Sequence, residues 1–182
     1  MEPATTGTGF IERLLRAARL DRRAYAGVET DARATPQAAL VVALSALAAG
    51  VGAGGHSLLA MGLGALGALV AWYLWAALVY WIGARLLPEP GTSASHGELL
   101  RTVGFASAPG LIRLLGLIPE LRTAVFLIAG VWMLATTVVA VREALDYRSL
   151  WRAIGVTALG WAVQIALLAG VMWLVGAPGG GA

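Results

Sequence analysis

The sequence predicts an all-α integral membrane protein with five transmembrane helices and an N-terminal amphipathic helix. The chain of 182 residues is 59% hydrophobic and only 13% charged, whereas soluble domains carry about 25% charged residues. No Asp, Glu, Lys or Arg occurs between Arg33 and Arg85, and none occurs after Arg152. These runs exceed the roughly 18 apolar residues that cross the hydrocarbon core of a bilayer.

Residues 1–35 are predicted to form a cytosolic region that contains one amphipathic helix. They lack the apolar stretch and small-residue cleavage site of a signal peptide, so we expect the N-terminus to be retained. Phe10, Leu14 and Ala18 recur at helical spacing, with arginines on the opposite face. Such a helix suits the headgroup region of an anionic membrane; the alternative is a helix packed on the protein's own cytosolic surface. The predicted lipid-facing basic patch consists of Arg13, Arg16, Arg19 and Arg23.

Residues 36–175 are predicted to form the membrane domain. The five spans are expected at about residues 36–53, 58–82, 97–117, 123–141 and 153–175, followed by a disordered tail at 176–182. Pro36 stands at a first-turn position, where its missing N–H costs no hydrogen bond. Ser95 and Glu98 have the spacing of a capping box for the third span.

The third predicted span carries both charges and helix breakers. Arg101 and Arg113 are separated by about 18 Å along an α-helix, within a hydrocarbon core about 30 Å thick. Either each arginine reaches toward its nearer interface, or Arg113 faces the bundle interior and pairs with Glu120 or a backbone carbonyl. Pro109 and Gly110 should kink or break the helix, and freed carbonyls at that depth need protein or a water-filled cavity around them.

The arginines favour an orientation with the N-terminus inside and the C-terminus outside. Eleven of the thirteen arginines then lie on the cytosolic side, in keeping with the positive-inside rule. A re-entrant third segment would change the tally to ten against three, so charge alone leaves both topologies open. Because cytoplasmic arginine in a membrane protein is mainly a topology signal, we expect no nucleic-acid partner.

Small residues predict close packing between the first two spans. They are four residues apart in each: Ala46, Gly50 and Gly54 in the first, and Ala60, Gly64 and Ala68 in the second. Such spacing lets membrane helices approach closely. It favours a tight hairpin, with a homodimer seam as the alternative.

The connection between the fourth and fifth spans, "VREALDYRSLWR", concentrates charged residues. Arg142 and Asp146 are four residues apart, a spacing that allows an ion pair on one helical face, and Glu143 lies between them. The segment is either a solvated connection that sets orientation, or a docking patch for headgroups or protein formed together with the N-terminal arginines.

Three stretches resemble the Yip family, the Ypt/Rab-interacting membrane proteins, in its prokaryotic five-span branch. They are "LLRAARLDRRAYAGVETDARATPQAALVVALSALAAGVG", "ELLRTVGFASAPGLIRLLGLIP" and "VWMLATTVVAVREALDYRSLWRAIGVTALGW". The resemblance covers roughly residues 10–174 and implies five spans, a cytosolic N-terminus and a short external C-terminus. Eukaryotic members act as adaptors that bind Rab-type GTPases, but their acidic "DLYGP"-type motif is absent here. No GTPase-binding residue is therefore assigned.

The sequence predicts neither an enzyme nor a metal or cofactor site. It has no cysteine, and His56 and His96 fall on opposite predicted sides of the membrane. No residues have the spacing of metal ligands, and no acid accompanies His56 and Ser57 to complete a catalytic triad.

We therefore expect a non-enzymatic adaptor or organiser of the bacterial inner membrane. Its partners would be anionic lipid headgroups and either a second protein or a second copy of the chain. The alternative is a small transporter or channel that uses the proline-kinked third span. The candidate functional residues are Arg101, Pro109, Gly110, Arg113, Glu120, Arg142, Glu143 and Asp146.

Overall fold

The computed structural model describes residues 9–176, and within that range the chain is a set of helices without strands. The helices are α1 (Phe10–Ala18), α2 (Arg22–Thr30), α3 (Thr35–Gly52), α4 (Leu58–Tyr80), α5 (His96–Ala106), α6 (Pro119–Ala144) and α7 (Leu150–Gly176). Three shorter helical elements join them: η1 (Ala32–Ala34), η2 (Trp81–Leu86) and η3 (Ala108–Leu117). The tail expected at 176–182 lies outside the described residues, apart from Gly176 at the end of α7.

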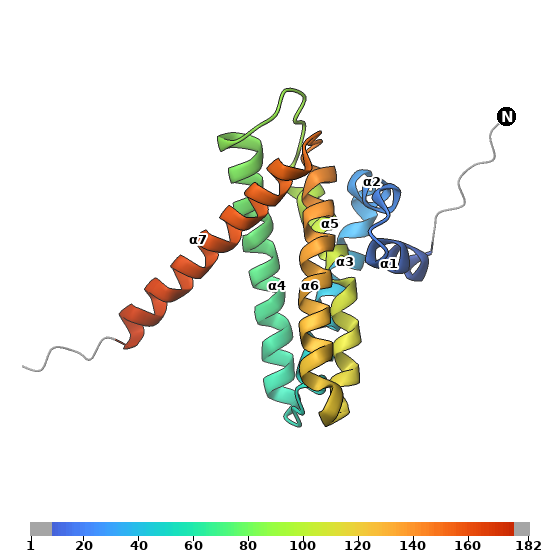
Figure 1. Cartoon of the computed structure of the whole chain (residues 1–182), viewed down its shortest axis with the longest axis vertical. Helices are drawn as coiled ribbons and strands as arrows, with labels where there is room; N and C mark the ends of the chain where they lie inside the picture. Colours follow the sequence, from blue (N-terminus) through green and yellow to red (C-terminus); the bar gives the residue numbers. More distant parts are fainter. Residues whose placement is uncertain (1–8, 177–182) are drawn as a thin grey trace, which may run out of the picture.

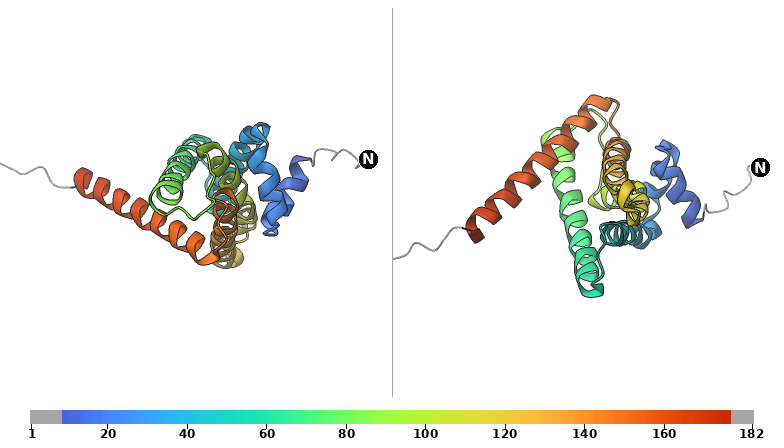
Figure 2. Two further views of the ribbon diagram at one scale, coloured as in Figure 1. Left: turned by 90° about the horizontal axis from the view of Figure 1, so that it is seen from above. Right: turned by 60° about the horizontal axis from the view of Figure 1, so that its bottom comes forward.

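Helices α3, α4 and α6 stand side by side with the combined segment α5–η3, which we call the third segment (Figure 1). We call the end formed by residues 53–57 and 118–122 the turn end, and the end formed by residues 87–95 and 145–149 the loop end. Helices α1 and α2 lie against the flank of this bundle. Helix α7 begins at the loop end and diverges from the bundle along its length (Figure 2).

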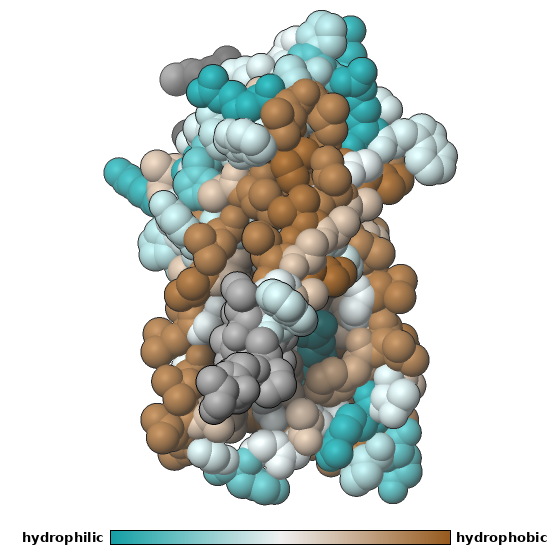
Figure 3. Space-filling model, turned by 90° about the vertical axis from the view of Figure 1, so that its left-hand side faces the viewer, coloured by the Kyte–Doolittle hydropathy of each residue, from teal (hydrophilic) through white to brown (hydrophobic). Residues whose placement is uncertain are grey.

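Four helical segments are long and apolar enough to cross a membrane. Among the described residues these are Ala32–Gly52, Leu58–Leu86, Pro119–Ala144 and Leu150–Leu167. Their outer surface is strongly apolar: Val70 on α4 is 60% exposed and Val131 on α6 is 69% exposed. Figure 3 shows this hydrophobic band between hydrophilic ends. Because a soluble monomer rarely exposes so large an apolar surface, the chain is an integral membrane protein.

The third segment is not a continuous α-helix. It begins with the predicted capping box, in which Ser95 Oγ accepts from the Glu98 N–H and Glu98 accepts from the Ser95 N–H. The α-helix ends at Ala106, and the chain continues as the 3₁₀ helix η3, with Pro109 in its first turn. Proline cannot supply a helical N–H, which explains the break at this point.

Glycine lets η3 approach α3 closely. A Cβ atom on Gly110 would overlap the Ser45 hydroxyl, and a Cβ on Gly52 would overlap the Arg113 carbonyl. The predicted close contact through Gly64 is wrong, because a Cβ there would meet nothing within 4 Å. The tightest packing of α3 is therefore with the third segment rather than with α4.

Two buried clusters hold the helices together. One joins α1, α2 and α3 to the third segment and α6, through Tyr25, Val41 and Phe105 among others. The second joins α4, α5, α6 and α7 at the loop end and includes Leu99 and Leu145. The half of α7 beyond the second cluster is left with few partners in the bundle, which is why it diverges.

Candidate functional site

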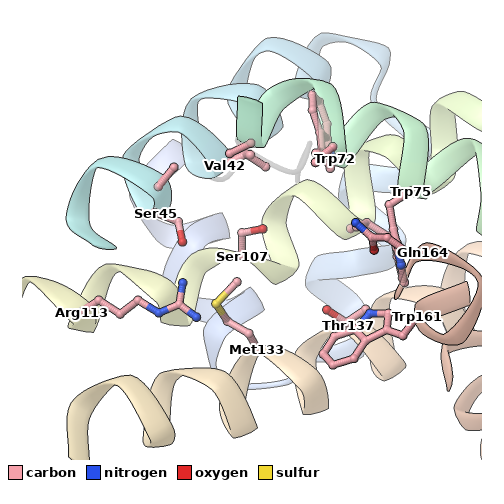
Figure 4. Close-up of a pocket in the computed structure, with 14 residues that line it drawn as sticks. Val42, Ser45, Trp72, Trp75, Ser107, Arg113, Met133, Thr137, Trp161 and Gln164 are labelled. Atoms are coloured by element: carbon pink, nitrogen blue, oxygen red, sulfur yellow. The ribbon is translucent and has the colours of Figure 1, made fainter. Parts of the chain in front are cut away.

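A cavity of about 350 Å³ lies between α3, α4, the third segment, α6 and α7. Most of its wall is apolar, but several polar side chains converge on it (Figure 4). They come from every one of these elements: Ser45, Trp72, Trp75, Ser107, Arg113, Thr137, Trp161 and Gln164. The cavity is therefore a partly polar site that lies between membrane helices and is open on one side.

Arg113 supplies the charge in this cavity. Its side chain points inward, toward Ser107 and Met133 (Figure 4). Its Nε is buried and has no hydrogen-bond partner among the described residues, and its guanidinium carbon lies 5.7 Å from the centroid of the Phe126 ring. A cation over an aromatic face is stabilised, but this contact does not neutralise its charge.

The expected partners of Arg113 do not pair with it. Glu120 is exposed at the start of α6, and no ion pair between the two forms in the described structure. The arginine faces the bundle interior, as one of the two sequence hypotheses required, but without the predicted acid. Pro109 and Gly110 explain the direction, because a 3₁₀ helix has 3.0 rather than 3.6 residues per turn. Residues after the break thus occupy different faces from those of an uninterrupted α-helix.

Two apolar grooves adjoin the cavity on either side of α7. The first, of about 580 Å³, lies between α4 and α7 and shares Ala71, Trp75 and Gln164 with the cavity. The second, of about 750 Å³, lies between α6 and α7 and shares Trp161. Figure 3 shows hydrophilic atoms recessed between hydrophobic side chains on this face. The cavity is thus continuous with surface that faces lipid.

Arg101 has a different role from Arg113. Its Nε donates to the carbonyl oxygens of Val28 and Glu29, at 3.0 Å each, and its Nη2 also donates to Glu29. Arg101 therefore fastens the C-terminal end of α2 to α5. Trp132 Nε1 similarly donates to the Ala18 carbonyl, at 2.6 Å, and fastens α1 to α6.

Glu29 lies in an unusual electrostatic environment. Burial, reinforced by the nearby carboxylates of Asp146, Glu98 and Glu143, raises the pKa of Glu29 to about 7, and Arg101 offsets only part of this. Acidic residues from α2, α5, the end of α6 and the α6–α7 connection therefore lie close together near the loop end.

The predicted pairing of Arg142 with Asp146 is wrong. Helix α6 ends at Ala144, and Asp146 has a φ of 53°, so the two residues do not share a helical face. Arg142 donates instead to the carbonyl oxygens of Tyr147 and Arg148, at 3.2 and 2.9 Å. Glu143 pairs with Arg22 of α2 at 2.5 Å, so the connection does meet the N-terminal region.

The N-terminal arginines divide into two groups. Arg13 pairs with Asp31 at 2.8 Å, and Arg16 pairs with Asp21 at 2.7 Å. These arginines lower the pKa of the Asp31 and Asp21 carboxyls. Within the described part of the chain, Arg19 and Arg23 are exposed and form no ion pair. A small pocket of about 50 Å³ between α1 and α2 is lined by Arg13, Arg16 and Arg23.

Some apolar side chains of α1 pack against the bundle, and others are exposed on the outer surface. Phe10 and Leu14 pack on the buried cluster, while Ile11 and Leu15 are 68% and 47% exposed. The apolar side of α1 therefore covers the bundle flank and continues onto the outer surface.

Sequence reasoning missed most of the polar cavity. Ser45, Ser107, Thr137 and Gln164 were not singled out, because each is a common residue in a membrane helix. Gln164 is the one amide side chain in the last predicted span, and that signal could have been used. For metals, no suitable group of three His, Cys, Asp or Glu residues occurs in the described range.

Comparison with known proteins gives one match. The family model described as the Yip1 domain matches residues 32–172, a range that includes the cavity and the third segment. No curated protein and no solved structure matches the chain.

Proposed function

The chain belongs to the Yip1 domain family, and on that basis we propose that it is a non-enzymatic adaptor or organiser of the bacterial cytoplasmic membrane. In this proposal it acts through contacts with anionic lipid headgroups and with a protein partner or a second copy of itself. The matched region accounts for the membrane domain, while α1 and α2 lie entirely before it.

The proposal includes five spans with the loop end in the cytosol. Its support is the path of the third segment: Arg101 contacts α2 near the loop end, whereas Arg113 and Gly116 lie against Gly52 at the C-terminal end of α3. The segment thus runs from one end of the bundle to the other, which a re-entrant loop would not do. Arg113 and Arg122 then lie toward the outside, and the remaining arginines lie toward the cytosol.

The observation that carries the proposal is the pair of arginines at the end of α1 and on α2, Arg19 and Arg23, that form no ion pair with the described residues. We call the outer surface of these two helices the α1–α2 flank. Arg19 and Arg23 are exposed, and the apolar side chains of Ile11 and Leu15 are exposed on the same short helical region. Arginine beside exposed apolar residues is the pattern of a helix at an anionic membrane surface. Arg23 also lines the small pocket between α1 and α2, beside Arg13 and Arg16, which pair with Asp31 and Asp21.

The test compares the double variant Arg19→Gln/Arg23→Gln with wild type in nanodiscs of phosphatidylglycerol and phosphatidylcholine. We expect the variant to retain fewer phosphatidylglycerol molecules in native mass spectrometry. We also expect it to lose a polypeptide that wild type, extracted in its own membrane, holds at fixed stoichiometry. Arg85→Gln is the matched control, because Arg85 is exposed on η2 near the loop end. If the double variant keeps both lipid and partner, the basic flank is not the contact surface.

A second function, a small transporter or channel, is favoured by the cavity that Arg113 lines. A polar cavity beside a broken helix is the arrangement in which membrane transporters hold their substrates. Under this hypothesis Arg113→Leu abolishes solute flux into reconstituted vesicles while the variant still folds. Unchanged flux would exclude a role for Arg113 in transport.

A further inference from the structure

We propose that the Arg113 cavity and the two grooves beside α7 together form a binding site for one anionic phospholipid. The phosphate would be held by Arg113, and the two acyl chains would lie in the grooves on either side of α7. This proposal goes beyond the function given above, because it uses none of the arginines of the α1–α2 flank.

The cavity presents hydrogen-bond donors that lack acceptors. Within the part of the chain that the structure describes, Arg113 Nε and Trp75 Nε1 are both buried without hydrogen-bond partners, and both residues line the cavity. No carboxylate is among the described residues that line it. Arg113 as a whole is half-buried, and placing a cation in a membrane without a nearby counter-charge is costly. The missing group is therefore an acceptor with negative charge, such as a phosphate oxygen.

The depth of Arg113 indicates why the anion would belong to a lipid. The Phe126 ring beneath its guanidinium lies about 10 Å along α6 from the start of that helix, at 1.5 Å per residue. Any phosphate must shed water to reach this level, but the acyl chains of a lipid keep its phosphate next to the site, whereas a free anion has no such anchor. A lipid enters instead from the side, through the opening between α4 and α7, with its head already at the membrane.

The two grooves match the two chains of a phospholipid. The α4–α7 groove is lined by Val70, Leu74 and Leu167, and the α6–α7 groove by Leu134 and Ile165, among others. Each groove shares at least one residue with the cavity. Their volumes of about 580 and 750 Å³ fall in the range typical of sites for organic ligands.

A phospholipid also supplies a second acceptor. Figure 4 places Arg113 and Trp75 at opposite ends of the cavity, so one small anion does not serve both. A phospholipid whose phosphate lies at Arg113 has further acceptors in its ester carbonyl oxygens, which lie on the side of the phosphate that leads toward Trp75. A fatty acid, with a single carboxylate, lacks this second group.

The test uses the full chain in detergent, titrated with phosphatidylglycerol or with phosphatidylcholine of the same chains, and counts retained lipid by native mass spectrometry. We expect the most tightly held lipid of wild type to be one phosphatidylglycerol, with at least tenfold preference over phosphatidylcholine. We expect Arg113→Gln to lose that preference. The variant Arg19→Gln/Arg23→Gln should keep it, so a failure of this proposal and a failure of the proposed function are told apart. Equal preference in wild type and Arg113→Gln would overturn the site.

A second pair of variants tests the groove without disturbing the fold. A Cβ on Gly67 or on Gly62 of α4 would meet nothing within 4 Å, and both glycines are exposed, so a side chain can begin at either position without a clash at its Cβ. Only Gly67 is among the residues that line the α4–α7 groove. Gly67→Phe should therefore weaken phosphatidylglycerol retention about tenfold, whereas Gly62→Phe should leave it unchanged. Equal retention in the two variants would place the lipid elsewhere.

Competition identifies the source of the anion. Inorganic phosphate at millimolar concentration and equimolar oleate are each added to the complex of wild type with phosphatidylglycerol. We expect neither to displace the lipid. Displacement by phosphate would show a site for a soluble anion, and displacement by oleate would show a site for a single-chain acid; either result overturns the assignment to a phospholipid.

Discussion

The guanidinium of Arg101 on α5 donates hydrogen bonds to the backbone carbonyl of Glu29, the penultimate residue of α2. This contact joins residues 72 positions apart in the chain, and it fixes the N-terminal helices to the third segment. A hydrogen bond that involves a charged group contributes about 1.5–3 kcal/mol.

Replacing Arg101 should release the N-terminal helices from the bundle. We expect Arg101→Gln to destabilise their attachment by roughly 1.5–3 kcal/mol, so that amides of α2 exchange hydrogen faster while those of α6 are unaffected. Hydrogen exchange with mass spectrometry measures both. Arg33→Gln is the control, because Arg33 is exposed and forms no ion pair in the described structure. Unchanged exchange in α2 would mean that Trp132 and the buried cluster suffice to hold it.

Glu29 should make stability depend on pH. Its pKa is about 7 in the folded protein against an ordinary value of 4.5, so the folded state binds its proton more tightly than the unfolded state. The contribution of Glu29 to stability is therefore fully present below pH 4.5 and is lost as the pH rises to 7, by on the order of 1 kcal/mol after allowance for solvent screening. Glu29→Gln should remove this decline and raise the thermal midpoint at pH 8. Scanning fluorimetry at pH 5 and pH 8 checks it, with the exposed change Glu12→Gln as control.

Enlarging Gly110 should destabilise the contact between η3 and α3. A Cβ there would overlap the Ser45 hydroxyl and lie 3.0 Å from the Met133 sulfur, so Gly110→Ala should cost about 1–3 kcal/mol. Gly130→Ala on α6 is the control: a Cβ there meets nothing within 4 Å, and alanine should stabilise the helix by about 0.5–1 kcal/mol. The combination with Ser45→Gly should recover part of the loss. If the free-energy changes of Gly110→Ala and Ser45→Gly simply add in the double mutant, the two residues are not in contact.

Tyr147 should hold the loop end together through its hydroxyl. The Tyr147 O–H lies 2.8 Å from the Gly83 carbonyl oxygen and 2.7 Å from that of Leu87. Tyr147→Phe removes this donor and should cost about 0.5–1.5 kcal/mol. Thermal unfolding measures the loss, and Tyr73→Phe is the control, since Tyr73 is 53% exposed on α4. Equal midpoints for the two variants would show that the ring of Tyr147, and not its hydroxyl, stabilises the loop end.

Local sequence signals predicted some features of the fold well. The uncharged runs indicated membrane helices, Ser95 and Glu98 predicted a capping box that the structure contains, and Pro109 predicted a break where η3 begins. Each of these features depends on neighbours a few residues away. Relationships between residues that are close in the chain can be recognised in a single sequence.

Features that depend on distant packing could not be predicted in the same way. The cavity forms because the 3₁₀ segment turns Arg113 inward and because α7 diverges from the bundle. The space left beside α7 is lined by Trp161 and Gln164. The proposed pair of Arg142 with Asp146 failed because it assumed a helix that continues past Ala144. The existence of α2 was also missed, since its docking depends on Arg101, some seventy residues away.

The 3₁₀ geometry of η3 also sets how far the third segment reaches. Residues 96–117 would extend about 33 Å as an α-helix, at 1.5 Å per residue. With η3 rising about 2.0 Å per residue, the same residues extend about 38 Å, close to the roughly 39 Å of the longer helix α6. The stretched backbone lets a shorter segment match the height of its neighbour. A deletion in η3 would therefore cost more length than a deletion of the same size in α5.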